Sequence, residues 1–95
     1  VLVLSIPDWG VTPFAFASGR DRQAVADELD AYNDAARDAC DAHGVAFVNI
    51  TDISRAGGGQ PAMLADDGLH PSATQYARWA EAALPVAARL LRSDN

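Results

Sequence analysis

The chain has 95 residues, which is enough for one small domain at most, and 49% hydrophobic residues with 21% charged residues is a globular composition that excludes a disordered chain. The formal net charge is −6, all seven basic residues are arginine, and they are scattered along the sequence; this excludes a basic nucleic-acid-binding surface and attachment to anionic membranes through clustered positive charge. No apolar run has transmembrane length, so we expect no stable membrane insertion.

The first predicted element is a strand over residues 1–6, a short apolar run that ends at Pro7. A continuous apolar run is typical of a parallel strand buried on both faces. Because the run opens the chain without an initiator Met, we expect the protein's own N-terminus to lie upstream, which leaves localisation open between cytoplasm and secretion. Residues 8–19 contain two glycines and a proline and are predicted to form a loop.

Residues 21–43 have helical periodicity, with acidic residues largely off the apolar stripe. The stripe comprises Val25, Leu29, Tyr32, Ala36, Ala39 and Cys40. Ser18 and Asp21 are spaced for a capping arrangement, and Gly44 is a plausible helix stop. Cys40, the single cysteine, is predicted to lie in the core, and it excludes an internal disulfide and a cysteine-based zinc site.

Residues 45–50 are predicted to form a second strand, joined to the first by a right-handed crossover that makes the pair parallel. Residues 51–69, which include three consecutive glycines, are predicted to be a long loop. A last helix is expected to begin near Ser72, where Ser72 and Gln75 fit a capping box, and Pro85 is expected to kink or restart it.

The predicted order is β-α-β-α. A parallel strand needs neighbours on both edges and helices on both faces, and two strands do not provide them. We therefore expect residues 1–95 to be the C-terminal part of one larger three-layer α/β/α domain, whose N-terminal part lies outside this sequence.

Asp67 and His70 are the candidate catalytic residues. Pro71 holds His70 in an extended conformation, and a turn through Gly68 lets the Asp67 carboxylate reach back to the imidazole. If that carboxylate accepts a hydrogen bond from Nδ1–H, Nε2 becomes the proton acceptor that a serine nucleophile requires. The alternative is a surface histidine in an Asp-Gly turn. The position of the loop after a parallel strand, where α/β sheets bind ligands, favours the catalytic interpretation.

The segment D-G-L-H-P-S with the amphipathic helix behind it resembles the last block of SGNH (GDSL-type) hydrolases. The opening V-L-V-L-S-I-P-D-W-G-V-T-P-F and the stretches D-E-L-D-A-Y-N-D and V-A-F-V-N-I-T-D are similar to the parts of that family leading to this block. The resemblance covers the whole chain, and its D-x-x-H block is the specific part. It implies a flavodoxin-like parallel sheet, with His70 as catalytic base and Asp67 as the residue that orients it.

The same resemblance implies a nucleophilic serine in a Gly-Asp-Ser block near the start of the domain, and an oxyanion hole from two further blocks. This sequence contains none of them, so we expect residues 1–95 alone to be inactive. Ser5, Ser54 and Ser72 are the local alternatives for a nucleophile, but none lies in a glycine-flanked elbow, and Ser72 is better explained as a helix cap.

Trp9 and Leu69 are candidate substrate-binding residues; the alternative for Trp9 is loop packing. Leu69 is also a candidate, with Met63 and Leu64, for an apolar wall. His43 near a helix end is expected to be a favourable charge there. Asp52 is expected to lie in a turn.

No cofactor and no metal are expected. Asp66, Asp67 and His70 lack a fourth ligand and make a poor zinc site. The glycine triplet lacks the lysine and the strand-to-helix placement of a phosphate-binding loop.

The sequence thus predicts a serine ester hydrolase, resembling carboxylesterases and lipases, that uses a Ser-His-Asp triad of which Asp67 and His70 lie in this chain. Its expected partners are a small-molecule or lipid acyl ester and, through the unfilled sheet, a second copy or the missing N-terminal part. The alternative is a non-catalytic α/β half-domain that acts as a binding or assembly module. The abundance of alanine, and of arginine without lysine, is typical of a GC-rich bacterial genome.

Overall fold

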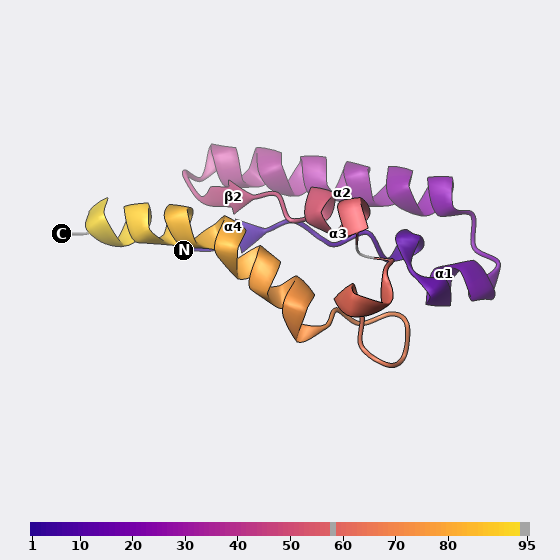
Figure 1. Ribbon diagram of the computed structural model, residues 1–95. Helices are drawn as coiled ribbons and strands as arrows, with labels where there is room; N and C mark the ends of the chain where they lie inside the picture. Colours follow the sequence, from indigo (N-terminus) through magenta and orange to yellow (C-terminus); the bar gives the residue numbers. More distant parts are fainter. Residues whose placement is uncertain (58, 94–95) are drawn as a thin grey trace.

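The computed structural model describes residues 1–57 and 59–93, and in them the chain is a small α/β structure. In chain order the elements are β1 (Leu2–Leu4), the 3-10 helix η1 (Trp9–Val11), α1 (Pro13–Ser18), α2 (Arg22–Ala42), β2 (Ala46–Val48), α3 (Thr51–Gly57), the 3-10 helix η2 (Pro61–Met63) and α4 (Ala73–Ser93). The strands β1 and β2 pair in parallel, as the sequence predicted. Figure 1 shows α2 on one side of these strands and α4 on the other.

The prediction that residues 8–19 form a loop was wrong, because this stretch contains η1 and α1. The Thr12 side chain accepts a hydrogen bond from the amide of Ala15, Pro13 occupies the first turn, and Gly19 ends the helix with a φ of 75°. Thr-Pro before a short apolar run followed by glycine is a helix signature in its own right. The sequence interpretation took the proline and the glycines only as helix breakers.

The prediction of a long loop over residues 51–69 was also wrong, since α3 and η2 lie within it. Of the glycine triplet, Gly57 is the last residue of α3 and residue 58 lies outside the described part of the chain. At Gly59 a Cβ would lie 2.4 Å from the carbonyl oxygen of Val11, so the segment after α3 passes directly against η1. The loop that remains around the candidate site is therefore short.

The predicted helix over residues 21–43 matches α2, but its cap and part of its buried stripe differ. Asp21 caps the helix with its own carboxylate, so Ser18 takes no part in the cap. Tyr32 is 69% exposed, and Asn33 is buried in its place. The side-chain oxygen of Asn33 accepts a hydrogen bond from the backbone N–H of Ile6, and its NH₂ group donates to the Thr51 hydroxyl. These hydrogen bonds offset the cost of burying the polar side chain. Cys40 is buried, as predicted.

The strand β1 is not buried on both faces as predicted. Leu2 and Val3 are half-buried and Leu4 is 39% exposed. Within the described residues β1 has one strand neighbour, β2, and the small sheet leaves part of its surface open. β2 packs against both α2 and α4, and the buried apolar residues come mainly from α2 and from the end of β2 with the residues after it, where Val48 and Ile50 lie.

The capping box predicted for α4 is half formed. The Ser72 hydroxyl accepts a hydrogen bond from the amide of Gln75 at 3.3 Å, whereas the Gln75 amide group donates to the carbonyl of Met63 at 2.7 Å. Gln75 is buried and thereby fastens the start of α4 to η2. The helix continues through Pro85 without restarting, and Figure 1 shows its axis changing direction along its length.

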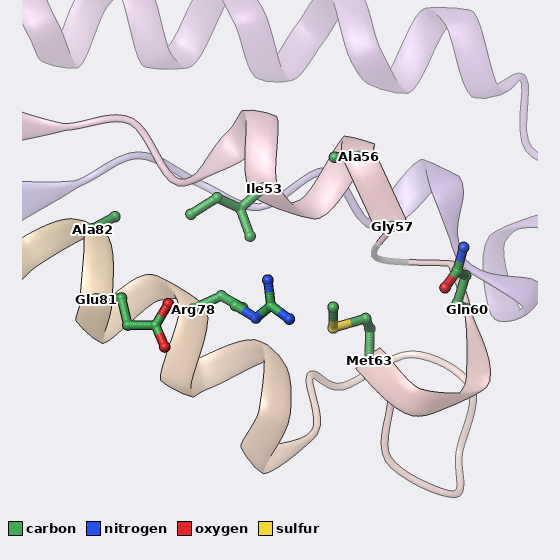
Figure 2. A pocket seen from close by; sticks show the side chains of 8 residues that line it. All are labelled: Ile53, Ala56, Gly57, Gln60, Met63, Arg78, Glu81 and Ala82. Atoms are coloured by element: carbon green, nitrogen blue, oxygen red, sulfur yellow. The ribbon is translucent and has the colours of Figure 1, made fainter.

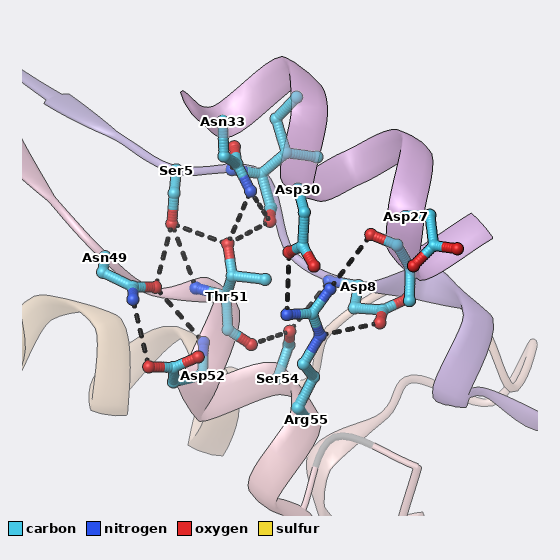
Figure 3. A network of polar contacts seen from close by, with 12 residues as sticks. Ser5, Asp8, Asp27, Asp30, Asn33, Asn49, Thr51, Asp52, Ser54 and Arg55 are labelled. Carbon is cyan, nitrogen blue, oxygen red and sulfur yellow. Dashed lines mark hydrogen bonds and ion pairs between the residues drawn. The ribbon is translucent and has the colours of Figure 1, made fainter. Parts of the chain in front are cut away.

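A buried polar network joins the carboxyl ends of the two strands (Figure 3). The Ser5 hydroxyl, just after β1, accepts the backbone N–H groups of Ile50 at 2.8 Å and Thr51 at 3.0 Å. The Thr51 hydroxyl in turn bonds the carbonyl of Ile6 at 2.6 Å. These bonds fix where the chain leaves each strand, and so they set the start of both segments that lead to the candidate site.

A second cluster in Figure 3 ties η1 to α3 and α2 through Arg55. Its guanidinium lies 2.9 Å from the carboxylate of Asp8, which is 4% exposed, and 2.9 Å from that of Asp30 on α2. The hydrogen bond to Asp8 is the main reason that the pKa of Arg55 is raised. The Ser54 hydroxyl accepts a hydrogen bond from the backbone N–H of Asp8 at 2.8 Å. These contacts from α3, and through Arg55 from α2, fix the position of Asp8 and thereby that of Trp9, the next residue.

Candidate active site

The candidate site is a turn between η2 and α4 that is closed by backbone hydrogen bonds at its base. The amide of Ala65 donates to the carbonyl of His70 at 2.7 Å, and Leu64 and Pro71 form an isolated antiparallel bridge. The amide of Ser72 donates to the carbonyl of Met63 at 2.9 Å. His70 therefore lies on a loop whose two sides are joined by backbone hydrogen bonds.

The carboxylate of Asp67 has a separate task for each of its oxygens. Oδ1 accepts the backbone N–H groups of Leu69 and His70, each at 2.9 Å, and so forms the turn. Oδ2 faces Nδ1 of the His70 ring within hydrogen-bonding distance. The two interpretations of the sequence, a turn former and a partner for the histidine, are thus both compatible with the same side chain.

Hydrogen bonding fixes the ionisation state of Asp67. The hydrogen bond from the His70 ring, followed by those from the backbone N–H groups of His70 and Leu69, lowers the pKa of Asp67 from 3.8 to about 2. The carboxylate is therefore ionised at neutral pH and is purely an acceptor. The proton between the two side chains consequently belongs to Nδ1 of His70.

The other ring nitrogen, Nε2, is then the one free to accept a proton. The His70 side chain is 70% exposed, and among the described residues Nε2 has no hydrogen-bond partner. An imidazole held at Nδ1 by a carboxylate, with Nε2 open, has the orientation that a general base needs.

The turn is also fastened to α1. The carbonyl of Gly68 accepts the amide of Phe14 at 3.2 Å, and the Gly68 backbone has a φ of 69°, which glycine adopts without strain. Pro13 lies beside it, 3.6 Å from where a Gly68 Cβ would be. The helix that the sequence interpretation missed is therefore one of the supports of the Asp67–His70 turn.

Trp9 and Leu69, the predicted substrate-binding residues, are brought together on one small cavity of about 40 Å³. Leu64 and Pro71 also line it. A space of this size holds about one water molecule or a methyl group. The Trp9 ring also lies under the guanidinium of Arg20, 5.6 Å away.

A larger groove of about 600 Å³ runs between α3 and α4 (Figure 2). Met63 lines this groove, whereas Leu64 and Leu69 line the small cavity, so the predicted apolar wall is divided between two hollows. In Figure 2 the Arg78 side chain extends into the groove between Ile53 and Met63. Neither Asp67 nor His70 lines it.

The local serines have structural roles. Ser5 and Ser54 are buried, with their hydroxyls bonded to backbone groups, and the Ser72 hydroxyl donates to the carbonyl of Ala62 at 2.8 Å. Asp52 lies in the first turn of α3, not in an isolated turn as expected, and accepts from the Asn49 amide. His43 is the C-cap residue of α2 and so lies at the helix end where the sequence placed it.

Residues 1–57 and 59–93 contain no group of three or more histidine, cysteine, aspartate or glutamate side chains placed to hold a metal ion. In the same residues, no helix has both the length and the apolar character required to cross a bilayer.

The fold and the turn define an α/β protein whose Asp–His pair follows the last strand of a parallel pair. The family model described as the GDSL-like lipase/acylhydrolase family matches residues 1–78, a range that includes the whole Asp67–Ser72 segment. The chain belongs to this family, as its resemblance predicted, and hence to a superfamily of ester hydrolases. Comparisons with curated proteins and with solved structures returned no match.

Proposed function

We propose that the protein is a serine ester hydrolase in which Asp67 and His70 are two members of a Ser-His-Asp triad. The observation that carries the proposal is the contact of His70 Nδ1 with an ionised Asp67 carboxylate, which leaves Nε2 exposed. The family membership supplies the class of reaction, hydrolysis of an acyl ester.

In the proposed reaction, Nε2 of His70 takes the proton of the serine hydroxyl as its oxygen attacks the ester carbonyl. Asp67 holds the ring and stabilises the imidazolium that results. His70 next gives this proton to the leaving alcohol and leaves an acyl-serine. It then takes a proton from water as water attacks the acyl carbon, and returns it to the serine oxygen as the acid leaves.

We propose further that the serine and the oxyanion hole come from a part of the protein outside residues 1–95, within one three-layer domain. The structural hydrogen bonds of Ser5, Ser54 and Ser72 support this, because using any of them as nucleophile would break contacts that hold the fold.

The test is His70→Ala in the full-length protein, assayed with a short p-nitrophenyl ester, with His43→Ala as the matched control. Loss of the general base is expected to lower kcat/KM by at least about 10³-fold. Because the His70 side chain is 70% exposed, its removal should not unfold the protein and should cost only the small contribution of the exposed Asp67–His70 pair. His43 lies at the far end of α2, and H43A should retain activity.

Unchanged turnover in H70A would refute the role assigned to His70. A full-length protein with an intact Asp67–His70 pair and no ester hydrolysis at all would instead favour the alternative, a non-catalytic binding or assembly module.

A further inference from the structure

Gln75, in the first turn of α4, is a buried polar residue beside the candidate catalytic turn. It is 2% exposed, although glutamine is usually a surface residue. Its side-chain amide donates a hydrogen bond at 2.7 Å to the backbone carbonyl of Met63, the last residue of η2. Such a bond fixes the two elements that it joins, because breaking it would leave polar groups without a partner in the interior.

The carbonyl of Met63 accepts two hydrogen bonds from the far side of the turn. One comes from the backbone N–H of Ser72 at 2.9 Å, and the other is the bond from Gln75. Two residues further into the turn, the amide of Ala65 donates to the carbonyl of His70 at 2.7 Å. A shift of Met63 relative to α4 would therefore be passed along these bonds to the backbone of His70.

The contact between Asp67 and His70 does not itself fix where the pair lies in the molecule. It joins two side chains three residues apart that are 48% and 70% exposed, so it aligns the ring only with its carboxylate. The turn is held to the flanking helices by the bond from Phe14 to Gly68 and by the bond from Gln75. The first joins two backbone groups, whereas the second comes from a side chain that a substitution can remove.

We propose that Gln75 is a positioning residue for His70, and that its bond to the Met63 carbonyl sets the distance from Nε2 to the serine nucleophile. Gln75 acts through the backbone of the turn and does not touch the reacting groups. A displacement of about 1 Å can lower the rate of such a step by about 10²-fold, because attack and proton transfer depend steeply on geometry. This proposal rests on the proposed esterase function and adds a residue to its machinery.

The test compares full-length wild type with Gln75→Met and Gln75→Glu, assayed on a short p-nitrophenyl ester well below the unfolding temperature of each variant. Methionine keeps the length of the side chain and removes the hydrogen-bond donor. Cys40→Ala is the control for lost stability, because Cys40 is buried near the C-terminal end of α2. Figure 1 shows this end of α2 well away from the turn that precedes α4.

Gln75→Met is expected to lower kcat by about tenfold or more and to change KM by less than about threefold, because the geometry of attack is altered and substrate binding is not. Nitrogen NMR of the His70 ring should still show the proton on Nδ1, since the contact with Asp67 lies within the turn. Cys40→Ala should keep the kcat of wild type while it lowers the unfolding temperature.

Gln75→Glu adds a rescue that depends on pH. A protonated carboxyl group at this position can donate its O–H to the Met63 carbonyl, whereas an ionised one has only acceptors. Burial raises the pKa of the introduced carboxyl group and brings this change closer to neutral pH. The ratio of kcat in Q75E to kcat in wild type should therefore rise as the pH falls, and the same ratio for Q75M should stay constant.

A wild-type kcat in Q75M would overturn the positioning role and leave the esterase proposal intact, because H70A decides the latter. An equal loss of kcat in Q75M and C40A would assign the effect to stability and overturn it as well. A Q75E ratio that does not change with pH would exclude the bond to Met63 as the cause, and this measurement decides the matter if Q75M does not fold. An active H70A protein would instead refute the esterase mechanism on which the proposal rests.

Discussion

Asp67 couples the shape of the turn to the chemistry of His70. Because Oδ1 is held by two backbone N–H groups, the carboxylate cannot rotate freely, and Oδ2 is presented to the imidazole at a fixed angle. On an exposed loop, ordering two side chains costs conformational entropy. Because Asp67 is already ordered by the turn it forms, less entropy is lost when it pairs with His70.

Asp67→Asn is expected to lower kcat/KM of the full-length esterase by about 10⁴-fold. If the Asn oxygen keeps the two backbone N–H groups, its NH₂ donates to Nδ1 of His70, and the proton moves to Nε2, where the base needs a lone pair. Nitrogen NMR of the His70 ring reports the tautomer directly. Asp66→Asn is the control, because Asp66 is one residue earlier and makes no hydrogen bond to the His70 ring. Activity near wild type in D67N would contradict this role.

The pKa of Asp67, about 2, gives a pH dependence with a defined sign. A carboxyl whose pKa is lower in the folded than in the unfolded state stabilises the fold above the unfolded value of 3.8, and this contribution is lost as pH falls toward 2. In a carbon NMR titration, H70A should raise the pKa of Asp67 only part of the way, since the two backbone N–H donors remain. A pKa in H70A equal to that of wild type would contradict the assignment of the ring as the main cause.

At the scale of elements, the turn depends on the helices on either side of it. The carbonyl of Gly68 accepts a hydrogen bond from the first backbone N–H of α1, and the side-chain amide of Gln75 in α4 donates to a carbonyl of η2. The turn is thus held by segments more than fifty residues apart in the sequence. This bracing relies on backbone geometry at Gly68, whose φ is 69°.

Gly68→Ala is expected to destabilise the protein by about 1 kcal/mol, because a residue with a Cβ is strained at this φ. The space beside Gly68 would accept a methyl group, so the cost is conformational and not steric. Gly57→Ala is the matched control: Gly57 is helical with nothing within 4 Å of its Cβ position, and alanine there should be neutral or stabilising. Urea unfolding measures both; an unaffected G68A would contradict the argument.

The ion pair between η1 and α3 offers a second test at this scale. Asp8 and Asp30 are both 2.9 Å from Arg55, but Asp8 is 4% exposed and Asp30 is 55% exposed. Asp8→Ala should cost about 2 kcal/mol, a value reduced for the 30% exposure of Arg55. Asp30→Ala should cost less than about 1 kcal/mol. Equal losses of unfolding free energy in the two variants, measured by urea unfolding, would show that burial does not determine the strength of these ion pairs.

At the scale of the whole molecule, the described part of the chain is extended. The radius of gyration is 14.7 Å, whereas a compact domain of this length is expected near 12.4 Å. Of the apolar side chains, Ile50 is the one large residue among those described that is fully buried, and Leu84 and Leu91 on α4 are 67% and 68% exposed. The indole N–H of Trp79 is buried and finds no acceptor among the described residues. A larger domain would supply an acceptor for this indole N–H.

We therefore expect the isolated 95-residue chain to be marginally stable or self-associated. A two-stranded sheet with half-buried β1 buries too little apolar surface to offset the entropy of folding. Sedimentation equilibrium and a denaturant melt at several concentrations test this. A cooperative, concentration-independent melt of a monomer would contradict it.

The sequence by itself determined the features that are local or periodic. The long helices α2 and α4 followed from their apolar periodicity, and the parallel pair followed from the order strand, helix, strand. The contact of Asp67 with His70 was also predictable, because the residues are three apart and the intervening glycine and following proline dictate a turn. The family followed from the same short segment.

The short helices escaped the periodicity of the sequence, and only the tertiary structure decided the long-range contacts. α1 and α3 span six and seven residues, too few for periodicity to reveal them. The exchange of Tyr32 for Asn33 on the buried face follows from bonds to Ile6 and Thr51, and the contact of Asp8 with Arg55 joins residues 47 apart. Such partners depend on how separate elements pack, which no single segment encodes. The same packing brought α1 against Gly68, and so fixed the candidate turn to a distant part of the chain.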